Sequence, residues 1–146
     1  MSPEAAQRVV AALHGLCLAN WSDFCRYPEA LRAYERNLRA GRHVYVSDQL
    51  TCGRPDCWST YRDLVKRYPS GSEPLMLDCE DAASAHIAYL AATCHQDLYM
   101  GLICGNPISH AVGAVKKNGK IVIVDPSRWY GMGETVYDNP VLRKVC

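Results

Sequence analysis

The sequence predicts an α+β fold in which helices pack against an antiparallel sheet. Helical signals fill the first half of the chain. The second half holds a long run of small residues and then two apolar segments on either side of Asn118-Gly119, the strongest short signal for a β-hairpin. We expect one domain over residues 1–146, with a mainly helical half, 1–72, and a half that carries a further helix and the sheet, 73–146.

The helical half is divided by proline and glycine. Ser2 followed by Pro3 marks a helix start, and the apolar positions that follow it recur at helical spacing. Pro28 opens a second helix that Gly41 closes. We further expect a short strand at 44–46, a third helix over 56–68 with Trp58, Tyr61, Leu64 and Val65 inward, and a strand over 99–104.

A helix is expected to begin at Cys79. Asp78 is a good N-cap residue, and Asp81 three positions later completes a start that is similar to a capping box. The run 82–92 is rich in alanine and leucine, which favours helix. Cys79 then lies in the first turn, where free N–H groups and the helix dipole stabilise a thiolate, whereas the charges of Glu80 and Asp81 oppose it.

The hairpin predicts that an imidazole and a carboxylate face each other. A two-residue loop at Asn118-Gly119 pairs Lys117 with Lys120, so that paired positions sum to 237. His110 and Asp125 are then diagonal neighbours on one face, about 7–8 Å apart at the backbone and within side-chain reach. A slip of one residue would separate them.

His110 is the expected base among the five histidines. His86 shares the azimuth of Cys79, but seven residues at ~1.5 Å each place it about 10 Å along the helix, too far for proton transfer. We interpret His86 as a core or groove residue and His95 as a favourable cation near the helix end. His14 and His43 are interpreted as structural or surface residues.

Thiol, imidazole and carboxylate in this order resemble the transglutaminase-like branch of the papain-like cysteine enzymes. The resemblance covers about residues 74–130 and depends on Asp-Cys-Glu-Asp at 78–81, His-Ala-Val at 110–112 and Val-Asp-Pro-Ser at 124–127. It departs at Leu77, where a glycine is frequent, and at Val112, where an aromatic residue is frequent. The acidic cysteine motif is similar to that of small proteins encoded by bacteriophages.

The resemblance implies a papain-like fold and a thiol-dependent acyl-transfer enzyme that acts on amide bonds of a protein or peptide. Cys79 would be the nucleophile, His110 the base and Asp125 the group that orients the imidazole. No cofactor or metal is implied. Water as acceptor gives a peptidase or amidase, and an amine gives a transglutaminase; the resemblance to small microbial members favours hydrolysis. The alternative is a non-catalytic assembly module, such as a virion component, that retains the fold.

Three further residues are candidates for the oxyanion site or the substrate groove. Gln49 and Trp58 precede the cysteine, where papain-like enzymes often supply a side-chain donor, and Trp129 follows Asp125. A surface turn for Gln49 and a core aromatic for Trp58 are the competing interpretations. Packing at the rim is the competing interpretation for Trp129.

Composition excludes several classes of partner. The formal net charge is +1, and glutamates are interleaved with the arginines between 26 and 42, so we expect a solvated helix face and no nucleic-acid site. No segment approaches the ~20 apolar residues of a membrane-spanning helix. The N-terminus lacks the layout of a signal peptide. We therefore expect a cytoplasmic protein, or one associated with virions, that binds no membrane.

Eight cysteines are many for that setting, and we interpret most of them as buried free thiols. The spacing of Cys52 and Cys57 fits a zinc knuckle, a disulfide across a turn or two unlinked thiols. No second Cys/His pair of suitable spacing follows in the sequence, which favours unlinked thiols.

Overall fold

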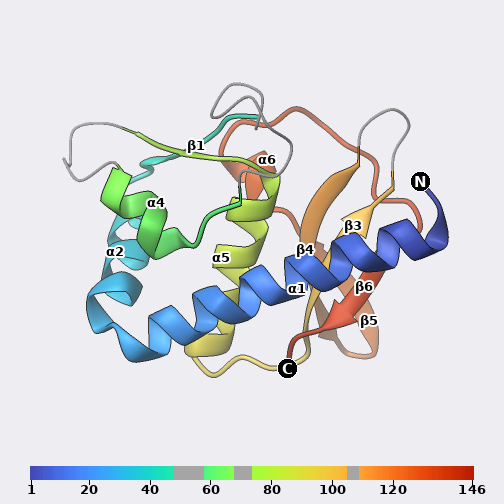
Figure 1. Cartoon of the computed structure of the whole chain (residues 1–146), viewed down its shortest axis with the longest axis horizontal. Coiled ribbons are helices and arrows are strands. Elements are labelled where there is room, and N and C mark those ends of the chain that lie inside the picture. Colours follow the sequence, from blue (N-terminus) through green and yellow to red (C-terminus); the bar gives the residue numbers. More distant parts are fainter. Residues whose placement is uncertain (48–57, 68–73, 105–108) are drawn as a thin grey trace.

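Helices and an antiparallel sheet form the described part of the chain (Figure 1). The computed structural model describes residues 1–47, 58–67, 74–104 and 109–146. The elements in chain order are α1 (Pro3–Arg26), α2 (Pro28–Arg39), β1 (His43–Tyr45), α4 (Tyr61–Arg67), β2 (Leu75–Leu77), α5 (Cys79–Ala92), β3 (Leu98–Ile103), β4 (His110–Lys117), β5 (Lys120–Val124), α6 (Pro126–Trp129) and β6 (Val141–Lys144).

The main sheet has the strand order β5-β4-β3-β6, and each neighbouring pair is antiparallel. This agrees with the predicted α+β class. The expected hairpin register is confirmed, because Gly113 pairs with Val124 and Lys117 with Lys120. Asn118 and Gly119 both have positive φ, 51° and 77°, as the twist of a two-residue hairpin loop requires.

Two helices, α1 and α5, pack against one face of the sheet. Figure 1 shows α1 running across the front of both α5 and the strands. Ten of the 14 residues of α5 are buried, which explains why its sequence is made of small side chains. The approach to β4 is so close that a Cβ on Gly113 would clash with the Ile87 side chain.

The first two helices agree with their sequence signals. Ser2 caps α1 by accepting from the Ala5 N–H at 3.1 Å, and Pro28 opens α2 after a break at Tyr27. Gly41 follows α2 with φ +66°, a conformation that favours glycine.

The third helix is shorter than predicted. Within the described residues it begins at Tyr61, so Trp58 precedes it and packs at the edge of the core instead of lying on its inner face. Tyr61 and Leu64 are buried as expected, and Val65 packs against the core. Residues 56–57 and 68 lie outside the described ranges.

Two short strands and one helical turn were not predicted. β2 pairs in parallel with β1, which begins one residue earlier than expected, and β6 pairs with β3 at the sheet edge. α6 follows Asp125 directly and packs against α5. In a strand of three or four residues, the alternation of apolar and polar side chains is too short to be recognised in the sequence when the partner strand is not known.

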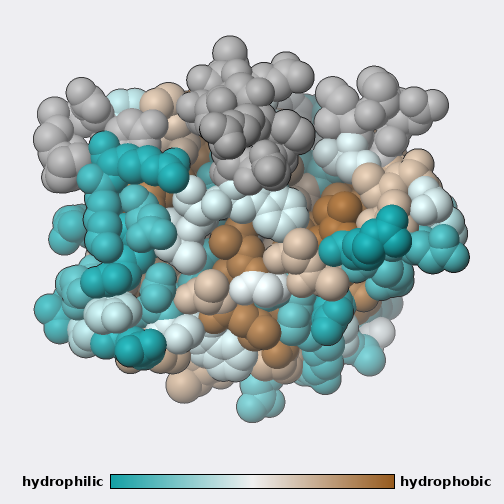
Figure 2. All heavy atoms as spheres, in the orientation of Figure 1, coloured by the Kyte–Doolittle hydropathy of each residue, from teal (hydrophilic) through white to brown (hydrophobic). Residues whose placement is uncertain are grey.

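Polar side chains cover the end of the molecule that carries α2 and α4, on the left of Figure 2. Arg32, Arg36 and Arg39 are exposed there, and Arg39 lies 4.0 Å from Glu35, as the interleaved charges predicted. None of the helices in the described ranges combines the length and apolar character that crossing a bilayer needs.

The cysteines in the described residues are free, but most are not buried. Cys17 is buried, whereas Cys25, Cys94 and Cys104 are exposed. The expectation of mostly buried thiols is wrong because these three residues lie on outer helix positions or in connections, where the fold leaves one side open. Cys52 and Cys57 lie outside the described residues.

The contact between α5 and β4 predicts a sharp difference between two glycine substitutions. Gly113→Ala forces the buried Ile87 side chain to move, and we expect it to lower the free energy of unfolding by about 1–3 kcal/mol. Gly15→Ala, in α1 with no atom within 4 Å of the new Cβ, should raise it by about 0.5–1 kcal/mol. Urea denaturation of the two variants measures both values. Equal stability of the two would contradict the close packing.

Candidate active site

His110 and Asp125 form a buried pair where β4 begins and β5 ends. Their Nε2 and Oδ2 atoms are 2.9 Å apart, and the side chains are 10% and 4% exposed. The predicted register therefore brings these two residues together. Because Asp125 accepts from Nε2–H, the other ring nitrogen, Nδ1, is the one that can take up a proton. Nδ1 has no hydrogen-bond partner among the described residues.

Tyr137 is a second donor to the same carboxylate. Its hydroxyl donates to Asp125 Oδ2 at 2.8 Å, whereas the buried Oδ1 has no partner within the described ranges. Tyr137 lies in the connection between α6 and β6 and belongs to no motif. Sequence reasoning missed it, because nothing in a connection of that length indicates which residue returns to the sheet.

Cys79 begins α5, as predicted. Asp78 caps the helix through its Oδ1, which accepts from the Asp81 N–H at 2.9 Å. The Cys79 thiol donates to Glu80 Oε2 across 3.7 Å. The backbone N–H of Cys79 itself has no partner among the residues that the structure describes.

The thiol lies near the strand position that follows His110, at the start of β4. Ala111 comes directly after His110 and lines the same pocket as Cys79. Side chains alternate along β4, and Gly113 faces α5, so His110 leaves the strand on the opposite side and reaches Asp125 there. Cys79 lies on the α5 side of β4, in the pocket that Ala111 also lines, whereas the His110 side chain leaves the strand on the other side.

Three carboxyl groups lie at the start of α5 beside Cys79 in the sequence, and one of them, Glu80, contacts the thiol. Burial raises the pKa values of Asp78, Glu80 and Asp81 to about 7, about 8 and about 7. Repulsion among their charges adds to the rise. The Trp58 Nε1–H donates to Glu80 Oε1 at 3.0 Å, which favours the charged form of that carboxyl without offsetting its burial. The cluster consequently holds protons near neutral pH.

The same surroundings keep the thiol protonated. Burial raises the Cys79 pKa well above its usual range, and the Glu80 charge raises it further. The Ala111 N–H acts in the opposite direction but is outweighed. The sequence left the net effect of the acidic neighbours open, and the structure shows that burial together with Glu80 outweighs the helix N-terminus.

A pocket of about 340 Å³ opens beside Cys79. Val9 and Leu13 of α1 form one wall, and Leu102 and Ala111 of the sheet form another. Trp58 also lines it, so this predicted groove candidate does lie at the thiol. Most of the lining is apolar; the polar groups at its surface are Ser109, Glu80 and the thiol itself.

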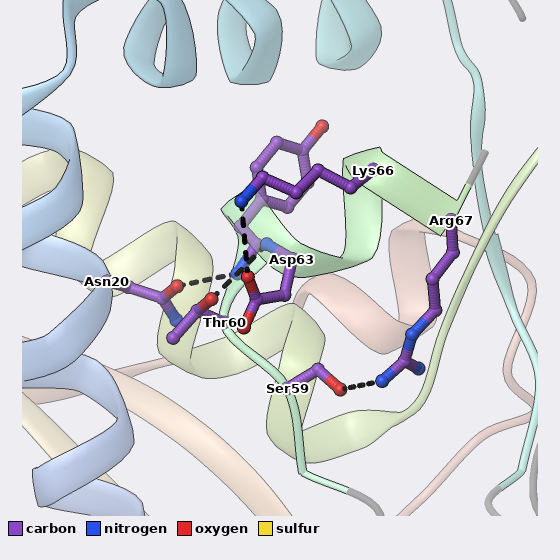
Figure 3. Close-up of polar contacts among 7 residues, drawn as sticks. Asn20, Ser59, Thr60, Asp63, Lys66 and Arg67 are labelled. Atoms are coloured by element: carbon purple, nitrogen blue, oxygen red, sulfur yellow. Dashed lines mark hydrogen bonds and ion pairs between the residues drawn. The ribbon is translucent and has the colours of Figure 1, made fainter. Parts of the chain in front are cut away.

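The segment that carries Trp58 is fixed to the helices by polar contacts (Figure 3). Asn20 of α1 accepts from the Tyr61 N–H at 2.7 Å, and Ser59 Oγ accepts from Arg67 at 2.9 Å. On the other side, the Ser59 N–H donates to Asp81 Oδ1 at 3.4 Å. These bonds hold the Trp58 ring over Glu80 although the residue lies in no helix or strand.

The other predicted groove residues do not join this pocket. Trp129 is 56% exposed, and its ring packs edge-on against His86 with the centroids 4.9 Å apart. It borders a separate hollow of about 390 Å³ that reaches Asp125 and Tyr137. Gln49 lies outside the described residues.

The remaining histidines have structural surroundings, as expected. His86 Nδ1 lies 2.7 Å from the Tyr34 hydroxyl, and His43 Nε2 lies 2.8 Å from the Tyr61 hydroxyl. Burial lowers both histidine pKa values to about 4, so both rings are neutral near pH 7. His14 and His95 contact backbone carbonyls near the surface.

The described residues contain no group of three or more potential ligands arranged to hold a metal ion. Comparison of the chain with protein-family models, with curated proteins and with solved structures gives no match.

The carboxyl cluster predicts a loss of stability at mildly alkaline pH. Three carboxyl groups, Asp78, Glu80 and Asp81, bind protons more tightly in the folded chain than in the unfolded chain. The stability that this binding adds to the fold is therefore lost as pH rises through about 7–8. The lowered pKa values of His43 and His86 make the free energy of unfolding rise with pH instead, but only between about pH 4 and 6.5. We expect the free energy of unfolding to fall by about 2–4 kcal/mol between pH 6.5 and 8, measured by urea denaturation. Glu80→Gln should remove about half of this fall.

Removal of the Glu80 charge should make Cys79 react at lower pH. Glu80→Gln keeps the acceptor for Trp58 but abolishes the negative charge that raises the thiol pKa. The midpoint of the pH profile for alkylation of Cys79 by iodoacetamide, followed by peptide mass spectrometry, should therefore move down by about one pH unit. Glu35→Gln in α2, a half-buried glutamate remote in the sequence from the thiol, is the matched control. An unchanged midpoint in Glu80→Gln would contradict the electrostatic role of Glu80.

Proposed function

We propose that this protein is a thiol-dependent acyl-transfer enzyme that acts on amide bonds through Cys79, His110 and Asp125. The observation that carries the proposal is the buried His110–Asp125 hydrogen bond, which leaves Nδ1 free to accept a proton, at the strand position before Ala111 of the thiol pocket. A buried imidazole held by a carboxylate is the arrangement that general-base activation of a thiol needs.

The first step begins with transfer of the thiol proton. The Cys79 side chain turns from Glu80 toward His110, and Nδ1 accepts the proton of the S–H bond as the sulfur attacks the amide carbonyl carbon. The unused Cys79 N–H at the start of α5 stabilises the negative oxygen of the tetrahedral intermediate. Cleavage of the C–N bond returns the proton from His110 to the leaving amine and leaves a thioester on Cys79.

The second step depends on the acceptor. Water gives up a proton to His110, attacks the thioester and releases a carboxylic acid, and the proton returns to the thiolate. A primary amine in place of water forms a new amide. We favour hydrolysis, on the resemblance of the cysteine motif at 78–81 to small microbial papain-like and transglutaminase-like enzymes, and we propose the corresponding fold on the same ground.

Protonation of the resting thiol supports a general-base route and not a permanent thiolate–imidazolium pair. Burial and Glu80 both favour the neutral thiol, so the negative charge develops on sulfur only as the carbonyl is attacked. The apolar walls of the 340 Å³ pocket support an acyl donor with an apolar side chain, because burial of such a chain there removes its surface from water.

Two substrates distinguish the possible acceptors. N-acyl-leucyl aminomethylcoumarin reports hydrolysis of an amide, and casein incubated with monodansylcadaverine reports transfer to an amine. We expect coumarin release that falls by about 10³-fold or more in Cys79→Ala and in His110→Ala, and by about 10²–10⁴-fold in Asp125→Asn. Cys25→Ala, which removes an exposed thiol, is the matched control and should keep full activity.

Covalent labelling of Cys79 tests whether it is an activated nucleophile without requiring that the protein turn over a substrate. A peptidyl acyloxymethyl ketone should modify Cys79 and lose this selectivity in His110→Ala. Dansyl incorporation in place of coumarin release would support the amine-acceptor form of the proposal. Absence of both turnovers, together with a Cys79 that stays unlabelled while Cys25 and Cys94 react with iodoacetamide, would overturn it in favour of a non-catalytic assembly module.

A further inference from the structure

The Asp125 carboxylate is held in an unusual way for a group of its burial. Two donors, His110 Nε2–H at 2.9 Å and the Tyr137 hydroxyl at 2.8 Å, share the single oxygen Oδ2. The second oxygen, Oδ1, is buried and has no partner in the described part of the chain. When only one carboxylate oxygen accepts hydrogen bonds, the group can rotate about its Cβ–Cγ bond and bring the other oxygen into the same place. A second donor on the occupied oxygen opposes this rotation.

Tyr137 lies in a connection outside the sheet and not in the hairpin that ends at Asp125. The connection between α6 and β6 carries it back to the end of β5, where it borders the 390 Å³ hollow together with Asp125 and Arg128. Burial and the bond to Asp125 raise the pKa of Tyr137, and the nearby Arg128 opposes that rise. The phenol therefore stays a donor throughout the pH range in which a thiol enzyme works.

We propose that Tyr137 is a positioning residue that acts through Asp125 to hold the His110 imidazole in the tautomer with hydrogen on Nε2. This inference rests on the proposed function of His110 as the base. Tyr137 touches neither the thiol nor the pocket beside it, so its effect on the reaction passes through the carboxylate alone.

Two hydrogen bonds on Oδ2 hold the carboxylate in place. Donors from opposite elements, β4 and the connection after α6, fix both the rotation of the carboxyl group and its distance from Nε2. Tyr137 and Asp125 line the same hollow of about 390 Å³, so the hydroxyl occupies Oδ2 at the side from which a solvent molecule could compete for it. Without the hydroxyl, water can bind Oδ2 and the carboxylate can rotate, so the Nε2–H tautomer loses its preference and Nδ1 becomes protonated in a fraction of molecules.

The matched test compares Tyr137→Phe with Tyr99→Phe. Both changes remove only a phenolic oxygen, and the Tyr99 hydroxyl has no hydrogen bond to a described residue. In ring-nitrogen NMR spectra of the full chain, we expect the His110 signals to move toward a mixture of the two tautomers in Tyr137→Phe. They should stay unchanged in Tyr99→Phe. Labelling of Cys79 by the acyloxymethyl ketone should slow by about tenfold in Tyr137→Phe, equivalent to about 1.4 kcal/mol.

A double-mutant cycle separates positioning from a general structural role. In the Asp125→Asn background, Tyr137→Phe should cause no further loss of labelling rate, because the group through which it acts has changed. A loss of the same size in both backgrounds would overturn the inference. Unchanged His110 signals and an unchanged pH profile of labelling in Tyr137→Phe would also overturn it.

Failure of the inference is distinguishable from failure of the proposed function. The NMR comparison reports the His110 ring whether or not the protein turns over any substrate. If wild-type Cys79 is labelled selectively and Tyr137→Phe behaves like Tyr99→Phe, only the positioning role fails. If wild-type Cys79 is not labelled, the proposed function fails even where the tautomer shift is observed.

Discussion

Burial of α5 is the constraint on which the rest of the structure depends. The helix is enclosed by α1 on one side and by the sheet on the other, so its residues must be small and its contact with β4 requires a glycine at 113. Burial also reaches the first turn, where Asp78, Glu80 and Asp81 are removed from water beside Cys79. The fold thus determines the chemistry of the thiol through its packing.

Hydrogen bonds from neighbouring groups offset the cost of burying the three carboxyl groups at the start of α5. Asp78 caps the helix, Trp58 donates to Glu80, and the Ser59 N–H donates to Asp81. Each carboxyl therefore has a hydrogen bond although none is exposed, which is the condition for keeping such groups in a core. The consequence is a neutral thiol near Ala111 and a separate, hydrogen-bonded imidazole–carboxylate pair at the start of β4.

The parts of the candidate site that depend only on neighbouring residues in the sequence could be predicted. Asn118-Gly119 fixed the hairpin register, and that register was sufficient to place His110 against Asp125. Asp78 marked the helix start that contains Cys79. These features follow from backbone geometry over a few residues, which the sequence encodes directly.

Features that depend on distant segments could not be predicted. β2 finds its partner β1 some thirty positions earlier in the chain, and β6 completes the sheet from the C-terminal end. Tyr137 reaches Asp125 only because the connection after α6 passes the end of β5. Trp58, expected on the inner face of a helix, instead lies before α4 and borders the thiol pocket.

By itself, the sequence determined the α+β class, the hairpin register, the start of α5 and the facing of His110 with Asp125, because each depends on short-range backbone preferences. Only the tertiary structure decided that the Cys79 thiol is protonated and directed at Glu80, and that Tyr137 shares the Asp125 oxygen with His110. The physical reason is that desolvation and the sharing of hydrogen bonds depend on which distant segments surround a group, and no local pattern records them.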